Sequence, residues 1–183
     1  MEPEEVAAAF DYLEQAGKVR HFGVSNQNPM MMELLKTAVK QPLKVNQLQL
    51  SAAFTPSFEA GFHVNMEGPK AAVRDGSVFE YCRLTDTVIQ AWSVLQHGYF
   101  KGNFVGKEEF VALNQVLNDL AKKYQVTPTA IALAWVLRYP GKMQAVIGTT
   151  KLQHVLEAGK AVTVTLTRKE WYQIYLAAGN DLP

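Results

Sequence analysis

Apolar residues recur along the chain at helical spacing in some stretches and as short runs in others. Between Glu4 and Gln15, for example, Val6, Phe10 and Leu13 share one face of a predicted helix. Short apolar runs predict strands over Val19–Val24, Val45–Leu50, Thr87–Ala91 and Ala145–Ile147. Helical spacing predicts helices over Glu4–Gln15, Pro29–Val39, Glu108–Tyr124, Thr129–Arg138, Lys151–Val162 and Thr167–Ala177.

Strand and helix alternate after the first helix, which is typical of a parallel sheet covered by helices. The helix over Thr129–Arg138 is apolar nearly all round, so we expect it to be buried. The stretch Ser51–Thr85 is rich in Gly, Pro and Ser and predicts a long functional loop, with one helical turn near Ala71. We therefore expect an α/β fold in which residues 1–183 form a single domain.

Composition and charge narrow the function classes. The chain has 183 residues, a formal net charge of +1 and 48% hydrophobic residues, as in an ordinary globular domain. The near-zero charge gives no electrostatic basis for a nucleic-acid or anionic-membrane partner, and no apolar run is long enough to span a bilayer. Cys82 is the single cysteine, so an internal disulfide is excluded and a buried or half-buried thiol is expected. These features fit a cytoplasmic protein.

Polar or aromatic residues follow every predicted strand. Ligands bind at the carboxyl ends of the strands in parallel α/β folds, so these positions are candidates for a site. Singly, each is better explained as a capping turn, a core tryptophan or a turn glycine. Together they would suit a carboxamide, a planar ring and a phosphate. The positions are Ser25–Asn26, Gln49–Ala53, Trp92–Ser93 and Gly148–Thr150, with Asn46–Gln47 inside the second strand.

The motifs at these positions resemble those of aldo-keto reductases. The resemblance covers essentially the whole chain, with the motifs in order and at plausible spacings. Its last two segments are similar to the bacterial YdhF-like branch of the family. The matching segments are Gly17–Asn26, Asn46–Gln47, Ala91–Leu95, Ala130–Leu137, Val146–Thr149, Leu166–Trp171 and Asp181–Pro183.

The resemblance implies a (β/α)₈ TIM barrel and an NAD(P)H-dependent oxidoreductase acting on a small carbonyl substrate, an aldehyde or ketone. It implies NADP as the cofactor, with NAD as the alternative, bound across the strand ends. Ser25, Asn26 and Gln47 would bind the nicotinamide carboxamide, and Trp92 would stack on the ring. The remaining contacts would be Ser93 and Leu95 at the pyrophosphate, Gly148 and Thr150 at the 2′-phosphate, and His154 and Glu157 at the adenosine.

Three positions depart from the family pattern. Val94 stands where a proline is usual, His154 where an arginine is frequent, and Ala158 where an asparagine occurs. Arginine is the better bidentate partner for a phosphate, so His154 weakens the preference for NADP over NAD.

The resemblance also implies that this chain is the C-terminal half of a barrel, with about four βα units. The family's catalytic Tyr, Lys, Asp and His come from the first four strands, so no catalytic residue is expected here and the chain alone should be inactive. Tyr99 and Lys101 are the nearest candidates to replace the family's catalytic tyrosine and lysine. The four histidines show no metal-ligand spacing.

A half-barrel would leave two open strand edges and would expose an apolar interior face. We therefore keep as an alternative a non-catalytic nucleotide-binding module or a half-barrel that self-associates as a homodimer through those edges.

Overall fold

The computed structural model of the chain describes residues 2–56, 58–59, 77–98 and 101–181. Within these residues four parallel strands form one sheet, and their order in the sheet is their order in the chain. This confirms the α/β fold with four βα units. The strands are β1 (Phe22–Ser25), β2 (Leu43–Gln49), β3 (Val88–Trp92) and β4 (Met143–Ala145).

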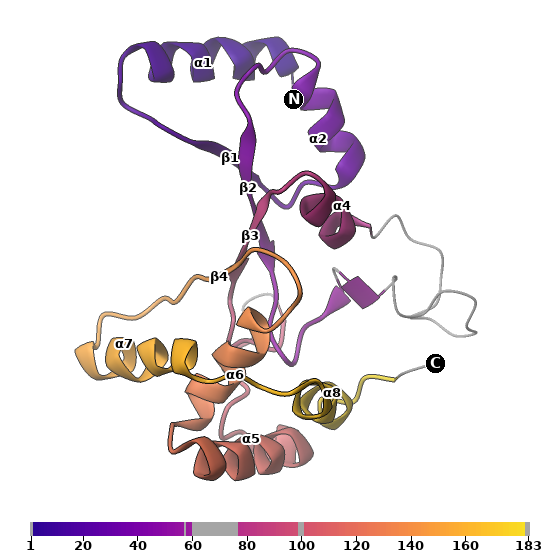
Figure 1. Cartoon of the computed structure of the whole chain (residues 1–183), viewed down its shortest axis with the longest axis vertical. Coiled ribbons are helices and arrows are strands. Elements are labelled where there is room, and N and C mark those ends of the chain that lie inside the picture. The colour runs from indigo at the N-terminus through magenta and orange to yellow at the C-terminus, as the bar shows by residue number, and fades with distance from the viewer. Residues whose placement is uncertain (1, 57, 60–76, 99–100, 182–183) are drawn as a thin grey trace.

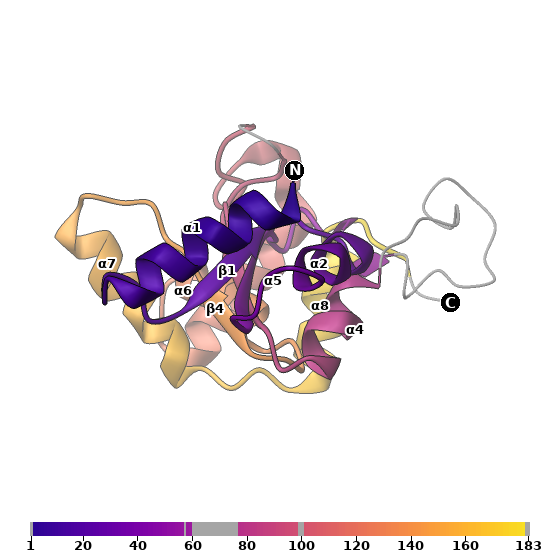
Figure 2. The same cartoon turned by 90° about the horizontal axis from the view of Figure 1, so that it is seen from above.

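Helices precede, separate and follow the strands. In Figure 1, α1 and α2 lie at the β1 end of the molecule, and α5 to α8 gather at the β4 end; Figure 2 gives the view from above. No helix among the described residues is both long enough and apolar enough to cross a membrane. The helices are α1 (Pro3–Gln15), α2 (Pro29–Lys36), α4 (Val78–Leu84), α5 (Val111–Tyr124), α6 (Pro128–Leu137), α7 (Leu152–Gly159) and α8 (Arg168–Ala177).

Several element bounds differ from the sequence-based expectation. β1 begins at Phe22 rather than Val19, and β4 ends at Ala145, where a strand over Ala145–Ile147 was predicted. Helix α4 was not predicted; it lies in the stretch taken as a loop and buries Phe79 and Cys82. The helical turn expected near Ala71 lies outside the described residues.

The core lies between the sheet and its helices. As predicted, α6 is buried on all sides, from Ala130 to Val136. Trp135 of α6 stacks on Trp171 of α8, with ring centroids 4.8 Å apart. Each indole N–H donates to the other residue's main-chain carbonyl at 3.0 Å, so both buried donors are satisfied and α8 is fixed to α6.

The other face of the sheet is partly exposed and carries a polar row. Ser25, Gln47, Gln90 and Gln144 are aligned by register across all four strands. An apolar face was expected here. Val45 and Val88, which lie two residues before Gln47 and Gln90 on the same strands, are apolar as expected, but the row itself is polar.

Candidate functional site

A cavity of about 520 Å³ opens at the carboxyl ends of β3 and β4. Six of the residues predicted to bind the cofactor line it: Trp92, Ser93, Leu95, Gly148, His154 and Glu157. The structure thus brings together residues from the end of β3, the turn after β4 and helix α7. The other lining residues are Val94, Gln96, Asn103, Thr129, Leu133, Val146, Ile147, Thr149 and Ala158.

The backbone turns sharply where β3 meets the cavity. Ser93 has a φ of 51°, in the left-handed region, and its carbonyl accepts a hydrogen bond from the Gln96 amide at 2.8 Å. A non-glycine residue in this region is uncommon and often marks a functional turn. Val94, which stands where the family has proline, is 3% exposed, so its side chain contributes to the core under the turn.

Asn114 of α5 holds the loop that follows this turn. Its side-chain oxygen accepts from the Gly106 amide at 2.7 Å. Its amide nitrogen donates to the carbonyls of Phe104, Lys107 and Phe110 at 3.0–3.1 Å. This buried asparagine satisfies several loop backbone groups at once, and the loop includes Asn103 at the cavity.

Ser25, Asn26 and Gln47 form a second group, on β1 and β2 and not among the cavity-lining residues. The Gln47 carbonyl accepts from the Ser25 hydroxyl at 3.2 Å and from the Asn26 amide at 2.9 Å. Asn26 has a φ of 53°, the same left-handed turn that Ser93 makes after β3. Two of the strand ends therefore carry a polar residue with a left-handed backbone.

The turn after β4 presents a different threonine from the one predicted. Thr149 lines the cavity, and its hydroxyl lies 3.3 Å from His154 Nδ1. The same oxygen accepts from the Lys151 amide at 3.2 Å. Thr150 is exposed and is not among the lining residues.

Asn46 and Gln47 face opposite sides of the sheet. Asn46 is fully buried and donates to the Gln27 carbonyl at 2.8 Å, so it supports the chain that follows Asn26. Asn46 thus has a structural role, whereas Gln47 lies on the partly exposed face.

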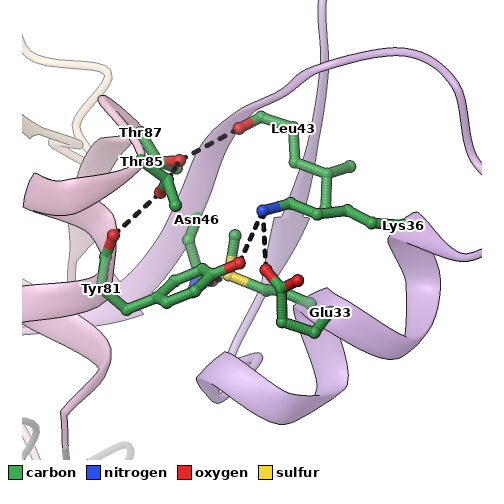
Figure 3. A network of polar contacts seen from close by, with 8 residues as sticks. Glu33, Lys36, Leu43, Asn46, Tyr81, Thr85 and Thr87 are labelled. Carbon is green, nitrogen blue, oxygen red and sulfur yellow. Dashed lines mark hydrogen bonds and ion pairs between the residues drawn. The ribbon is translucent and has the colours of Figure 1, made fainter.

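A tyrosine and a lysine also meet in this structure, but away from the cavity. Lys36 Nζ of α2 donates to the Tyr81 hydroxyl of α4 at 2.5 Å and to Glu33 at 2.9 Å (Figure 3). Nearby, the Thr87 hydroxyl donates to the Leu43 carbonyl at 3.2 Å. Leu43 and Val88 begin their strands, so this network lies at the opposite end of the sheet from Trp92. It joins α2 to α4 and does not supply an acid to the cavity.

Sequence reasoning missed the two other glutamines of the polar row. Gln90 lies inside an apolar strand, between Ile89 and Ala91, the same anomaly that singled out Gln47. Gln144 precedes the predicted strand Ala145–Ile147, so the sequence pattern did not place its side chain on either face of the sheet. Gln96 was also missed, because its burial at the cavity depends on the turn at Ser93.

The cavity contains groups that suit a dinucleotide. The Gln96 side-chain oxygen is buried and has no hydrogen-bond partner among the described residues. A buried acceptor without a donor is costly. The half-buried indole of Trp92 provides a flat surface in the same cavity. Within the described residues no group of His, Cys, Asp or Glu side chains could hold a metal ion.

Known proteins with similar sequences share one family. The sequence profile of the Aldo/keto reductase family matches residues 1–177. The chain is 33% identical to 6-dehydroglucose reductase of Agrobacterium fabrum, over the whole chain and 54% of that relative. It is 32% identical to the oxidoreductase YdhF of Escherichia coli, over the whole chain and 55% of that relative.

Solved structures show the same fold. An aldo-keto reductase of Klebsiella pneumoniae, in complex with NADP and acetate, matches with a TM-score of 0.71 at 20% identity, over 95% of this chain and 53% of that one. The thermostable aldo-keto reductase Tm1743 matches with a TM-score of 0.70 at 20% identity, over 97% and 55%. This chain therefore spans about half the length of the relatives it matches. It belongs to the Aldo/keto reductase family.

Proposed function

We propose that the chain forms the nucleotide-binding half of an NAD(P)H-dependent carbonyl oxidoreductase. The observation that carries this proposal is the cavity at the ends of β3 and β4, which gathers six of the ten residues expected at the cofactor. The NADP in the Klebsiella pneumoniae relative supports NADP as the cofactor. The substrate is a small aldehyde or ketone. The buried free thiol of Cys82 is compatible with a reducing, cytoplasmic location.

Each part of the site has a proposed role. The bound cofactor would supply a hydride to the carbonyl carbon. Trp92 would stack on the nicotinamide ring and fix the face that it presents, and the buried acceptor of Gln96 would receive a ligand N–H or O–H. The polar contacts would come from Ser25, Asn26 and Gln47 at the carboxamide, Ser93 and Leu95 at the pyrophosphate, Gly148 and Thr150 at the 2′-phosphate, and His154 and Glu157 at the adenosine.

Proton transfer to the carbonyl oxygen needs a general acid within hydrogen-bond reach. Among the described residues, neither a tyrosine nor a lysine lines the cavity. Tyr99, one of the two candidate replacements for the catalytic pair, lies outside the described residues, and the other, Lys101, is exposed. We propose that this chain alone binds nucleotide without reducing a carbonyl.

Calorimetric titration of the full chain with NADPH tests this proposal. Saturable binding is expected, and Trp92→Leu should weaken it about tenfold, because the ring loses its stacking partner. Tyr12→Leu, which changes an exposed aromatic residue on α1, is the matched control and should bind normally. A parallel titration with NADH decides between the two cofactors. Absence of saturable binding, or full affinity in the Trp92 variant, would contradict the proposal.

A second candidate function is self-association of the half-barrel. Leu152, Val155 and Leu156 of α7 are 73%, 44% and 56% exposed, although they form the apolar side of an amphipathic helix. Beside them, β4, α6 and α7 enclose an apolar groove of about 520 Å³. We propose a second copy as the occupant, because β1 of one copy placed beside β4 of the other would give eight parallel strands, the number that closes this kind of barrel.

Sedimentation equilibrium distinguishes this second candidate. A dimer is expected, and Val155→Asp should convert it to a monomer because the charge would be buried in the groove. Gln153→Asp, on the same helix but outside the groove lining, is the control and should remain dimeric. A monomeric wild-type chain, or a dimer that survives Val155→Asp, would exclude the candidate.

A further inference from the structure

The polar row on the partly exposed face is a continuous hydrogen-bonded chain. Gln90 Nε2 donates to Gln144 Oε1 at 2.9 Å, and Gln47 Nε2 donates to Gln90 Oε1 at 3.4 Å. The Ser25 hydroxyl donates to the main-chain carbonyl of Gln47 at 3.2 Å and ties β1 to the row. The side-chain amides of the row are therefore bonded from β2 to β4 with one direction of donation, and Ser25 joins the row at the main chain of Gln47.

This direction determines what Gln47 presents to a ligand. A primary amide has a donor side and an acceptor side, and a half-turn of the amide exchanges them. Because the Gln47 nitrogen is engaged by Gln90, its oxygen is left as an acceptor without a partner among the described residues. Reversing Gln47 alone would place two oxygens against each other, so Gln90 and Gln144 oppose that reversal.

We infer that Gln90 and Gln144 are positioning residues that hold the Gln47 amide as an acceptor, so that the site selects a carboxamide over a carboxylate on the bound ring. Trp92 lies two residues after Gln90 on the same strand, and both alternate to the same face of β3. A ring stacked on Trp92 would thus lie beside the row. The amide NH₂ of nicotinamide can donate to Gln47, whereas the carboxylate of nicotinate would meet its oxygen with like polarity.

This inference rests on the proposed nucleotide site, and its test separates the two. The full chain is titrated with NADP, with nicotinate adenine dinucleotide phosphate, and with 2′,5′-ADP, which has no nicotinamide. The wild-type chain should prefer NADP to the nicotinate analogue by about tenfold or more, as expected for one well-aligned hydrogen bond to a charged or amide group. Binding of 2′,5′-ADP reports the rest of the site.

Gln90→Leu and Gln144→Leu should reduce this preference to about twofold and leave the affinity for 2′,5′-ADP unchanged. Gln115→Leu, an exposed glutamine on α5, is the matched control and should retain the preference. Gln144 is exposed, so its variant tests the row even if Gln90→Leu fails to fold. An unchanged preference in the Gln144 variant, or no preference in the wild type, would overturn the inference alone. A wild-type chain that binds none of the three nucleotides would overturn the proposed function as well.

Discussion

Glu170 lies in the first turn of α8, forms a capping box with Thr167, and accepts several hydrogen bonds. It accepts from the Thr167 amide and hydroxyl, from Lys123 at 2.6 Å and from the Tyr124 hydroxyl at 2.8 Å. Burial raises the pKa of Glu170, but these hydrogen bonds outweigh it and lower the pKa to about 2. The spacing of Thr167 and Glu170 is typical of a capping box and is visible in the sequence. The contacts of Glu170 with Lys123 and Tyr124 depend on how α5 packs against α8.

Because the pKa of Glu170 is lowered, the free energy of unfolding depends on pH in the acid range. The ionised form is favoured in the folded state, so its contribution of about 3 kcal/mol is complete above the ordinary pKa of 4.5 and is lost as the pH falls towards 2. Urea unfolding across this range should show the loss. Glu170→Gln should unfold more easily at neutral pH and should lack this part of the pH dependence. A variant with the wild-type slope would contradict the assignment.

Gly23 is required by the close approach of β1 to β2. A Cβ placed there would lie 2.7 Å from the Val45 carbonyl oxygen and 2.7 Å from Val45 Cβ. Gly23→Ala should therefore destabilise the chain by about 2 kcal/mol, because the backbone must shift to relieve the overlap. Gly159→Ala, in α7 where a Cβ meets open space, is the control and should be neutral or slightly stabilising. Equal unfolding midpoints for the two variants would contradict this role for Gly23.

At the scale of elements, the helices and the presence of four strands were predictable, whereas the ends of the shortest strands were not. The heptad-like spacing of Leu113, Leu117 and Leu120 places α5 correctly, because one helix face must be buried. The apolar run Ala145–Ile147 suggested a strand, yet β4 pairs with β3 only as far as Ala145. Val146 and Ile147 instead line the apolar groove between β4, α6 and α7. Pairing partners decide where a three-residue strand ends, and they are not visible in a local pattern.

The loop after β3 depends on α5 through Asn114. Asn114→Ala would leave the Gly106 amide and several loop carbonyls without partners, so we expect a loss of about 3 kcal/mol in unfolding free energy. The loop also lines the cavity, so nucleotide affinity should fall in the same variant. Gln115→Ala, on the neighbouring exposed position of α5, is the control for both measurements. A variant with unchanged stability and affinity would show that the loop does not need this anchor.

At the scale of the whole molecule, the site separates into two groups. The cavity with Trp92 and His154 lies at the ends of β3 and β4, whereas Ser25, Asn26 and Gln47 lie across the sheet on β1 and β2. The order of motifs made both groups predictable. The link between them was not, because the Gln47–Gln90–Gln144 row exists only once the strand register is known. The described part of the molecule thus carries groups suited to holding a dinucleotide. The hydrogen-bonded pair of Lys36 and Tyr81 lies at the other end of the sheet.

Equilibrium dialysis of the full chain against NADPH, followed by addition of an aldehyde, tests whether this chain binds nucleotide without reducing a carbonyl. The separation of binding from proton chemistry predicts an excess of NADPH on the protein side and no loss of its nicotinamide absorbance after the aldehyde is added. Equal NADPH on both sides, or aldehyde-dependent oxidation by this chain alone, would contradict it.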